Sequence, residues 1–132
     1  MYNYYEAMKS DIIEVLPEYL AYYDKDTVVD EEGNIDRVEL YEKLNEDLWI
    51  DDSVTGNSSG SYFFDEKESR DAVGENLDLL CVALREFDCD WSCIAKGFEY
   101  CDVTIRCYLL GEILWEVIKE TTDEEIIEMF NQ

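Results

Sequence analysis

The chain has 132 residues, and 34 acidic side chains against 10 Lys and Arg, with no histidine, give a formal charge of −24 at pH 7. Hydrophobic residues still make up 47% of the sequence, including ten Tyr, five Phe and three Trp. This composition argues against a disordered chain and predicts a single folded domain, residues 1–132. Because histidine is the commonest general base and zinc ligand, we expect no enzyme and no catalytic residues.

The sequence also predicts the cellular compartment. No stretch approaches the roughly 18 consecutive apolar residues of a membrane span, and the N-terminus lacks the basic start and apolar run of a signal peptide. The five cysteines are an odd number crowded between Cys81 and Cys107, which makes a poor disulfide framework. We therefore expect a cytoplasmic protein without a membrane contact, whose cysteines are thiols or metal ligands.

The N-terminal part of the chain predicts two helices joined by an acidic loop. Apolar residues recur in steps of three and four from Tyr5 to Tyr23, which indicates an amphipathic helix over about residues 3–22. The following segment has no periodicity and is read as a solvated loop, and a second helix is expected over about residues 35–47. Its predicted apolar stripe consists of Val38, Tyr41, Leu44 and Leu48.

The composition then changes abruptly to Gly, Ser and β-forming residues over about residues 50–64, which predicts a short β-hairpin. Because an isolated hairpin is only marginally stable, we expect Trp49, Phe63 or Phe64 to pack against the helices. Helices are expected in the rest of the chain over about residues 66–87, 90–100, 103–120 and 123–130. Asp102 is expected to cap the third of these, and Thr122 with Glu125 is expected to form a capping box for the last. The predicted fold class is therefore α+β: a mainly helical single domain of five or six helices with one short β-hairpin.

The cysteines allow two interpretations. Cys81 and Cys107 fall on predicted apolar stripes and are expected to be small core residues. Cys89 and Cys93 flank a predicted helix start, at a spacing that would let two thiolates share one soft metal ion, with Cys101 able to join them. The sequence therefore leaves open a structural zinc ion held by Cys89 and Cys93, against the alternative of free or buried thiols.

Acidic residues recur at helical spacing on the outer faces of the first two predicted helices. Such carboxylates repeat about every 6 Å along a helix, and duplex DNA carries a negative charge about every 1.7 Å. Two rows can approximate a strip of phosphates, so a basic nucleic-acid-binding protein is the expected partner. The alternative is an acidic surface that serves only solubility. The candidate partner-binding residues are Asp11, Glu14 and Glu18 (first carboxylate row), Asp36, Glu39, Glu42 and Glu46 (second carboxylate row), and Asp30, Glu31 and Glu32 in the loop.

Three blocks of sequence suggest relatives. They lie in residues 47–62, 75–80 and 101–110 and read DLWIDDSVTGN with SGSY, ENLDLL and CDVTIRCYLL. Together they resemble a family of small acidic proteins carried by phages and mobile elements of Gram-positive bacteria. The resemblance implies a counter-defence role, and the nearest functional class is the anti-CRISPR proteins that bind and block type II RNA-guided Cas nucleases. It carries no functional residue over onto this sequence.

The charge and the resemblance together predict a phage-encoded anti-CRISPR protein in the cytoplasm of an infected or lysogenic bacterial cell. Its acidic surface would bind a type II Cas nuclease and block the loading of target DNA. One alternative is a DNA-mimic inhibitor of a restriction enzyme or a DNA-binding regulator. Another is a metal-stabilised protein-interaction adaptor without nucleic-acid mimicry, organised by Cys89 and Cys93. None of these functions requires direct binding to nucleic acid.

Overall fold

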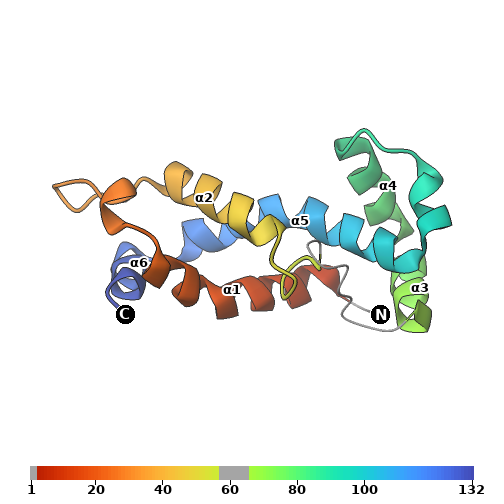
Figure 1. Cartoon of the computed structure of the whole chain (residues 1–132), viewed down its shortest axis with the longest axis horizontal. Helices are drawn as coiled ribbons and strands as arrows, with labels where there is room; N and C mark the ends of the chain where they lie inside the picture. The colour runs from red at the N-terminus through yellow and green to blue at the C-terminus, as the bar shows by residue number, and fades with distance from the viewer. Residues whose placement is uncertain (1–2, 57–65) are drawn as a thin grey trace.

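The computed structural model describes residues 3–56 and 66–132, and this part of the chain is mainly helical (Figure 1). It contains no β-strand; an isolated antiparallel bridge joins Val29 to Ile35. The α-helices are α1 (Tyr4–Tyr22), α2 (Arg37–Trp49), α3 (Glu66–Glu75), α4 (Leu77–Glu86), α5 (Phe98–Glu120) and α6 (Asp123–Phe130), and the 3₁₀ helices are η1 (Lys25–Thr27) and η2 (Trp91–Lys96).

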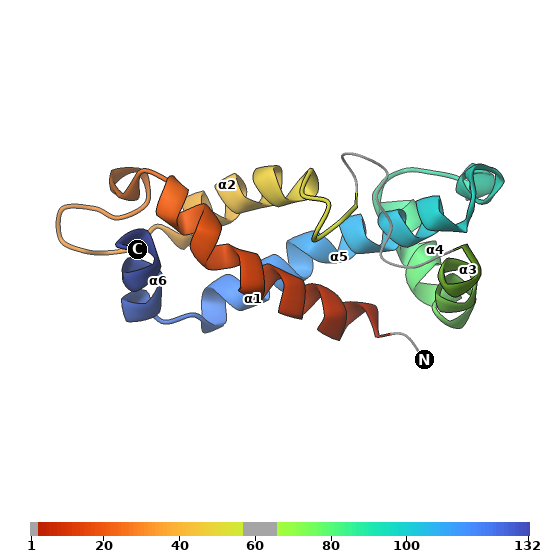
Figure 2. The same cartoon turned by 60° about the horizontal axis from the view of Figure 1, so that its bottom comes forward.

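Helix α5 is the spine of the molecule. Its 23 residues span about 34 Å, and α1, α2, α3 and α4 all pack against it. Figures 1 and 2 show α1 and α2 along one half of α5, with α3 and α4 at its N-terminal end and α6 beyond its C-terminus. The side chains of Ile105, Leu110, Ile113 and Leu114 are fully buried, so one hydrophobic core follows this helix.

Helix α1 confirms the predicted N-terminal helix. Its N-cap is Asn3, whose side chain accepts a hydrogen bond of 3.1 Å from the Glu6 backbone N–H, as N-cap residues do. The centre of its buried face agrees with the predicted apolar stripe, whereas Tyr5, Tyr19 and Tyr23 at the two ends of that stripe are only half-buried. The buried residues are Tyr4, Met8, Ile12, Leu16 and Leu20.

Helix α2 begins and ends two residues later than predicted, and its predicted core is partly wrong. It buries Leu40, Leu44 and Leu48, whereas Val38 is 56% exposed and Tyr41 is half-buried. Residues 40, 44 and 48 lie one above another at four-residue spacing, so the contact with α5 follows this row. Val38 and Tyr41 lie on the flank and are left at the surface.

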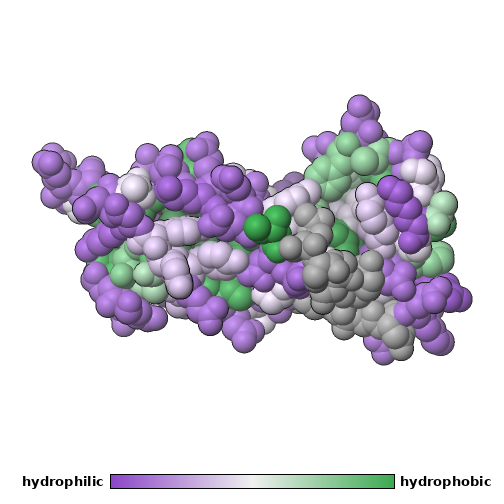
Figure 3. Space-filling view, in the orientation of Figure 1, coloured by the Kyte–Doolittle hydropathy of each residue, from purple (hydrophilic) through white to green (hydrophobic). Residues whose placement is uncertain are grey.

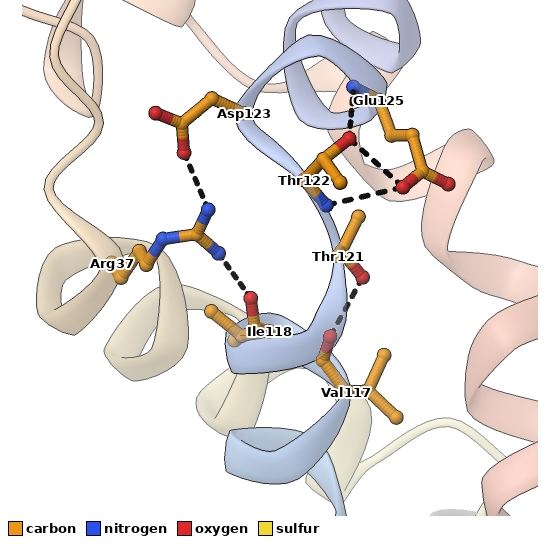
Figure 4. Close-up of polar contacts among 7 residues, drawn as sticks. All are labelled: Arg37, Val117, Ile118, Thr121, Thr122, Asp123 and Glu125. Carbon is orange, nitrogen blue, oxygen red and sulfur yellow. Dashed lines mark hydrogen bonds and ion pairs between the residues drawn. The ribbon is translucent and has the colours of Figure 1, made fainter.

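Arg37, the first residue of α2, joins three helices at one junction (Figure 4). Its guanidinium donates to the Ile118 carbonyl at the end of α5 and pairs with the Asp123 carboxylate of α6 at 2.5 Å. The last carbonyls of a helix have no partner within it, and Arg37 satisfies one of them. The adjoining capping box of Thr122 and Glu125 is present as predicted.

The predicted β-hairpin is wrong, and the fold is mainly helical rather than α+β. Its first arm, residues 50–56, folds into consecutive turns after α2. The Asp51 side chain accepts hydrogen bonds from the Ser53 backbone N–H and hydroxyl at 2.8 and 2.6 Å, and the Asp51 carbonyl accepts from the backbone of Val54 and Thr55. This local bonding by Asp outweighs the β-propensity of the segment. The second arm, with Phe63 and Phe64, lies outside the described residues.

Two other predicted boundaries are also wrong. The helix expected over residues 66–87 is two helices, because the Asn76 side chain donates to the Ala72 carbonyl at 2.8 Å and ends the first of them. The segment 90–100 is mostly the 3₁₀ helix η2, and Gly97, with a φ of +114°, turns the chain into α5. Asp102, the expected cap, therefore lies within α5 and is buried.

Candidate functional site

The structure keeps most of the predicted carboxylates at the surface. Figure 3 shows hydrophilic side chains over much of the half of the molecule formed by α1, α2 and the loop between them. Asp11 and Glu39 are half-buried, and the other eight candidates are exposed: Glu14, Glu18, Asp30, Glu31, Glu32, Asp36, Glu42 and Glu46. Exposed carboxylates interact with a partner at long range, so this surface would attract a basic protein.

Four of the candidates also have structural roles. Asp36 is the N-cap of α2 and accepts from the Glu39 backbone N–H at 3.0 Å, and Glu39 itself lies 3.9 Å from the Lys43 ammonium. Asp30 accepts from the backbone of Glu32 and Asn34 at 2.9 and 2.8 Å; the Asn34 hydrogen bond is the main cause of its lowered pKa. Asp11 is close to the buried Arg106, and burial raises its pKa.

Lys43 pairs with Glu39 on this surface, but three other cations near α1 and α2 are engaged elsewhere. Lys9 of α1 donates to Glu116 and Glu120 of α5 at 3.1 and 3.2 Å. Arg37 pairs with α6, and Arg106 is buried beside Asp102. Lys9 and Arg37 join helices and Arg106 is buried within the fold, so these three side chains do not neutralise the outward carboxylates of α1 and α2.

A cleft lies at the end of the first carboxylate row, with Glu18 in its lining, and Glu46 of the second row acts electrostatically on Tyr23 within it. This tyrosine cleft has a volume of about 390 Å³ and is lined by Glu18, Tyr19, Tyr22, Tyr23, Asp47 and Asp51. The Tyr19 hydroxyl donates to Asp51 at 2.6 Å, and the Tyr23 hydroxyl donates to Asp47 at 2.5 Å. Helix α1 and its C-cap Tyr23 thus supply the aromatic side chains, while α2 and the turn after it supply the two acceptors.

The electrostatics of the tyrosine cleft favour a cation. Burial raises the pKa of both Tyr19 and Tyr23, and the hydrogen bonds to Asp51 and Asp47 raise it further, so both phenols are neutral at physiological pH. Burial acts to raise the pKa of Asp51, but hydrogen bonds from Ser53 and Tyr19 more than offset it and the net shift is downward. An ionised carboxylate beside neutral aromatic rings can bind a Lys or Arg side chain by charge and by cation–π contact.

The sequence did not reveal this cleft. Helical periodicity places Tyr19 and Tyr23 on the apolar face of the first predicted helix, and Asp51 falls in the segment expected to form a hairpin. The sequence nevertheless contains a spacing that could have identified the cleft. Tyr19 and Tyr23 are four residues apart, and so are Asp47 and Asp51. This spacing puts two side chains on one face of a helix. Matching these two pairs across antiparallel helices would have placed them together.

The cysteines are arranged differently from the predicted zinc ligands. The structure brings Cys93 of η2 and Cys101 of α5 together, with 3.3 Å between their sulfur atoms, and both are buried. Burial and the neighbouring Cys93 raise the pKa of Cys101 to about 12. Cys89 is exposed, and its thiol donates to the Phe87 carbonyl at 3.3 Å. Within residues 3–56 and 66–132, no three Cys, Asp or Glu side chains form a metal-binding group.

The chain matches no protein family, no curated protein and no solved structure. The resemblance to phage counter-defence proteins therefore stays a prediction. Among the described residues, no helix has both the length and the apolar character needed to cross a membrane.

Proposed function

We propose that this chain is a non-enzymatic inhibitor that binds a basic, nucleic-acid-binding protein through the surface of α1 and α2. The observation that carries the proposal is the tyrosine cleft, because it contains Glu18 of the first carboxylate row, lies beside Glu46 of the second and offers carboxylates beside aromatic rings. Its position would let one bound Lys or Arg side chain fix the register of the whole acidic surface on its partner.

The inhibition would take place in two steps. The net charge of −24 steers the protein to a Lys- and Arg-rich channel, and this step weakens as salt screens the charges. A cation from the channel then enters the tyrosine cleft, where its charge is paired with Asp47, Asp51 or Glu18. Nucleic acid that uses the same cations is excluded while the complex lasts.

The first client to test is a type II Cas nuclease, because the sequence resemblance implies that class. Its channel for the guide–target duplex contacts the backbone and is positively charged, as the proposal requires. The protein would then act in the cytoplasm of an infected bacterial cell. A restriction enzyme or a DNA-binding regulator offers the same chemistry and is the second candidate. The adaptor function organised by a zinc ion at Cys89 and Cys93 has less support, since the described residues hold no metal-binding group of three such side chains.

The test is target DNA cleavage by a purified type II Cas nuclease, with the protein added before or after the DNA at low and at high salt. We expect inhibition only when the protein is added first, and weaker inhibition at high salt. Loss of inhibition at every salt concentration and with several type II nucleases would exclude this client and direct the search to restriction enzymes.

A pair of charge-reversal variants separates the site from the overall charge. Glu18→Lys/Glu46→Lys changes exposed carboxylates in and beside the cleft, and Glu124→Lys/Glu128→Lys changes two exposed carboxylates of α6. Both variants alter the formal charge by the same amount. We expect the first to abolish inhibition and the second to retain most of it. Equal inhibition by the two would show that the surface of α1 and α2 is not the binding site.

A further inference from the structure

A second surface of the molecule is largely apolar and aromatic, unlike the acidic surface of α1 and α2. An open groove with a volume of about 690 Å³ runs between α2, the end of α4 and α5, and the outline of the molecule dips between α2 and α4 (Figure 3). We call it the aromatic groove. Its apolar and aromatic lining consists of Val38, Tyr41, Trp49, Phe87, Tyr108 and Trp115.

The aromatic groove has an ordered wall. Tyr41 and Trp115 meet edge to face, with ring centroids 5.4 Å apart, and Trp49 and Phe87 meet in the same way at 5.8 Å. Gly111 of α5 lies beside Tyr41, and a Cβ atom there would be 3.0 Å from the Tyr41 hydroxyl oxygen. The missing side chain thus lets Tyr41 lie close to α5. Edge-to-face pairs hold their rings in place, so the groove is formed before a partner arrives.

Much apolar surface in this groove remains in contact with water. Val38 is 56% exposed, and Trp49 and Phe87 are each 36% exposed. Contiguous exposed apolar surface of this kind marks interaction sites, and tryptophan and tyrosine are the side chains most enriched at interface hot spots. Val38 and Tyr41 belong to the apolar stripe predicted for the second helix, and Phe87 ends the helix expected over residues 66–87, so helical periodicity alone would assign all three to the core.

The charges at the rim of the aromatic groove indicate what kind of partner it can bind. Glu42, Glu86 and Glu112 also line the groove, and no Lys or Arg does among the residues described. A second copy of this chain would bring carboxylates against these three and would be repelled by its charge of −24. The complementary occupant carries apolar side chains with Lys or Arg beside them.

We propose that the aromatic groove binds an amphipathic, basic α-helix of a partner protein. A groove between helices accepts a helix whose apolar residues recur at three- and four-residue spacing, and the described part of the chain has no strand edge to which an extended segment could add. The apolar face of the helix packs on Trp49, Phe87 and Trp115, and its Lys or Arg side chains pair with Glu42, Glu86 and Glu112. The inference does not depend on the identity of the client.

The probe is a synthetic helical peptide of Leu and Lys with all Leu on one face, and its control is a scrambled peptide of the same composition. Both have the same charge, so only the first presents an apolar face. The protein carries Trp91→Phe, because Trp49 and Trp115 are then its only tryptophans and their emission reports on the groove. We expect the helical peptide to change this emission, to gain helicity by circular dichroism and to bind about tenfold more tightly than the scrambled one, or about 1.4 kcal/mol.

Two matched variants locate the binding site. Val38→Lys places a cation on the lip of the groove, and Ile13→Lys places one on α1 at a similarly exposed position, 52% against 56%. We expect Val38→Lys to weaken peptide binding about tenfold and Ile13→Lys to leave it nearly unchanged. Equal effects of the two variants, equal binding of the two peptides, or a bound peptide without helicity would overturn the proposal. The variant Glu18→Lys/Glu46→Lys should still bind the peptide. Failure of the proposed inhibitor function can therefore be distinguished from failure of peptide binding in the aromatic groove.

Discussion

Removal of the buried cation Arg106 gives the sharpest test of how α1 is held on α5. Asp102 and Arg106, one turn apart on α5, are 0% and 1% exposed, and the Arg106 Nε lies 3.2 Å from both carboxylate oxygens. From α1, the Tyr4 ring lies 5.7 Å from the guanidinium, and Asp11 interacts with it electrostatically. Arg106→Met keeps a long apolar stem but leaves two carboxylates without their cation.

We expect Arg106→Met to lower the free energy of unfolding by about 3–5 kcal/mol at pH 7, the usual cost of breaking a buried ion pair from one side. The double variant Asp102→Leu/Arg106→Met removes both charges and should recover most of that loss, because well-packed apolar pairs often replace buried ion pairs without cost. A domain of ordinary stability has about 5–15 kcal/mol in total, so the single variant is expected to fold only marginally.

The loss of stability in Arg106→Met is expected to depend on pH in one direction. Burial raises the pKa of Asp102, although Arg106 and a hydrogen bond from Tyr4 act to lower it. A carboxyl group with a raised pKa binds its proton more tightly in the folded state, so it favours folding at low pH and loses this contribution as the pH rises through the raised pKa. Without Arg106 the pKa rises further, and the deficit of Arg106→Met should therefore shrink between about pH 7 and about pH 5.

Urea unfolding followed by circular dichroism measures the free energy of unfolding of the wild type, the single variant and the double variant at both pH values. The reasoning fails if Arg106→Met costs less than about 1 kcal/mol at pH 7, if its deficit does not depend on pH, or if the double variant is no more stable than the single one.

Three further predictions concern other groups. Tyr23→Phe should lower the free energy of unfolding by about 1–2 kcal/mol, because the hydroxyl bonded to Asp47 is lost. Since the pKa of Tyr23 is raised in the folded state, wild-type stability should fall above about pH 10 and fall less steeply in this variant; equal slopes would contradict this. A thiol reagent should modify exposed Cys89 first and the buried Cys101 and Cys107 last, because burial raises the pKa of both to about 12; equal rates in the folded protein would contradict the burial. Thr122→Ala should cost about 1 kcal/mol through loss of the capping box with Glu125, and an unchanged melting temperature would refute it.

The sequence predicts helices well where local signals agree. Helix α6 begins at its predicted capping box, since Thr122 and Glu125 satisfy each other within one turn. The helix expected over residues 66–87 breaks because Asn76 bonds to the backbone behind it, which periodicity does not register. The hairpin prediction is wrong for a similar reason, because Asp51 forms a local turn among residues that otherwise favour strands.

The surfaces were harder to predict than the helices. Periodicity identifies the apolar side of a helix, but the neighbouring elements decide which of those residues are covered. The periodicity therefore predicts Val38 and Tyr41 as core residues, although they line the aromatic groove. The predicted carboxylate rows do lie mainly at the surface. The cleft at Tyr19 and Tyr23, however, depends on how α1 crosses α2, which the sequence pattern does not give.

The spine arrangement has a consequence for the dynamics of the protein. Helices α1 and α2 pack on α5 in one half of the molecule, whereas α3, α4 and η2 pack on it at the other end. Stability is seldom uniform in such a structure, and groups of elements open as separate cooperative units. Amide protons of α3 and α4 should therefore exchange with solvent by partial openings that leave α1 and α2 closed, so the acidic surface can stay intact while the far end of the protein unfolds and refolds.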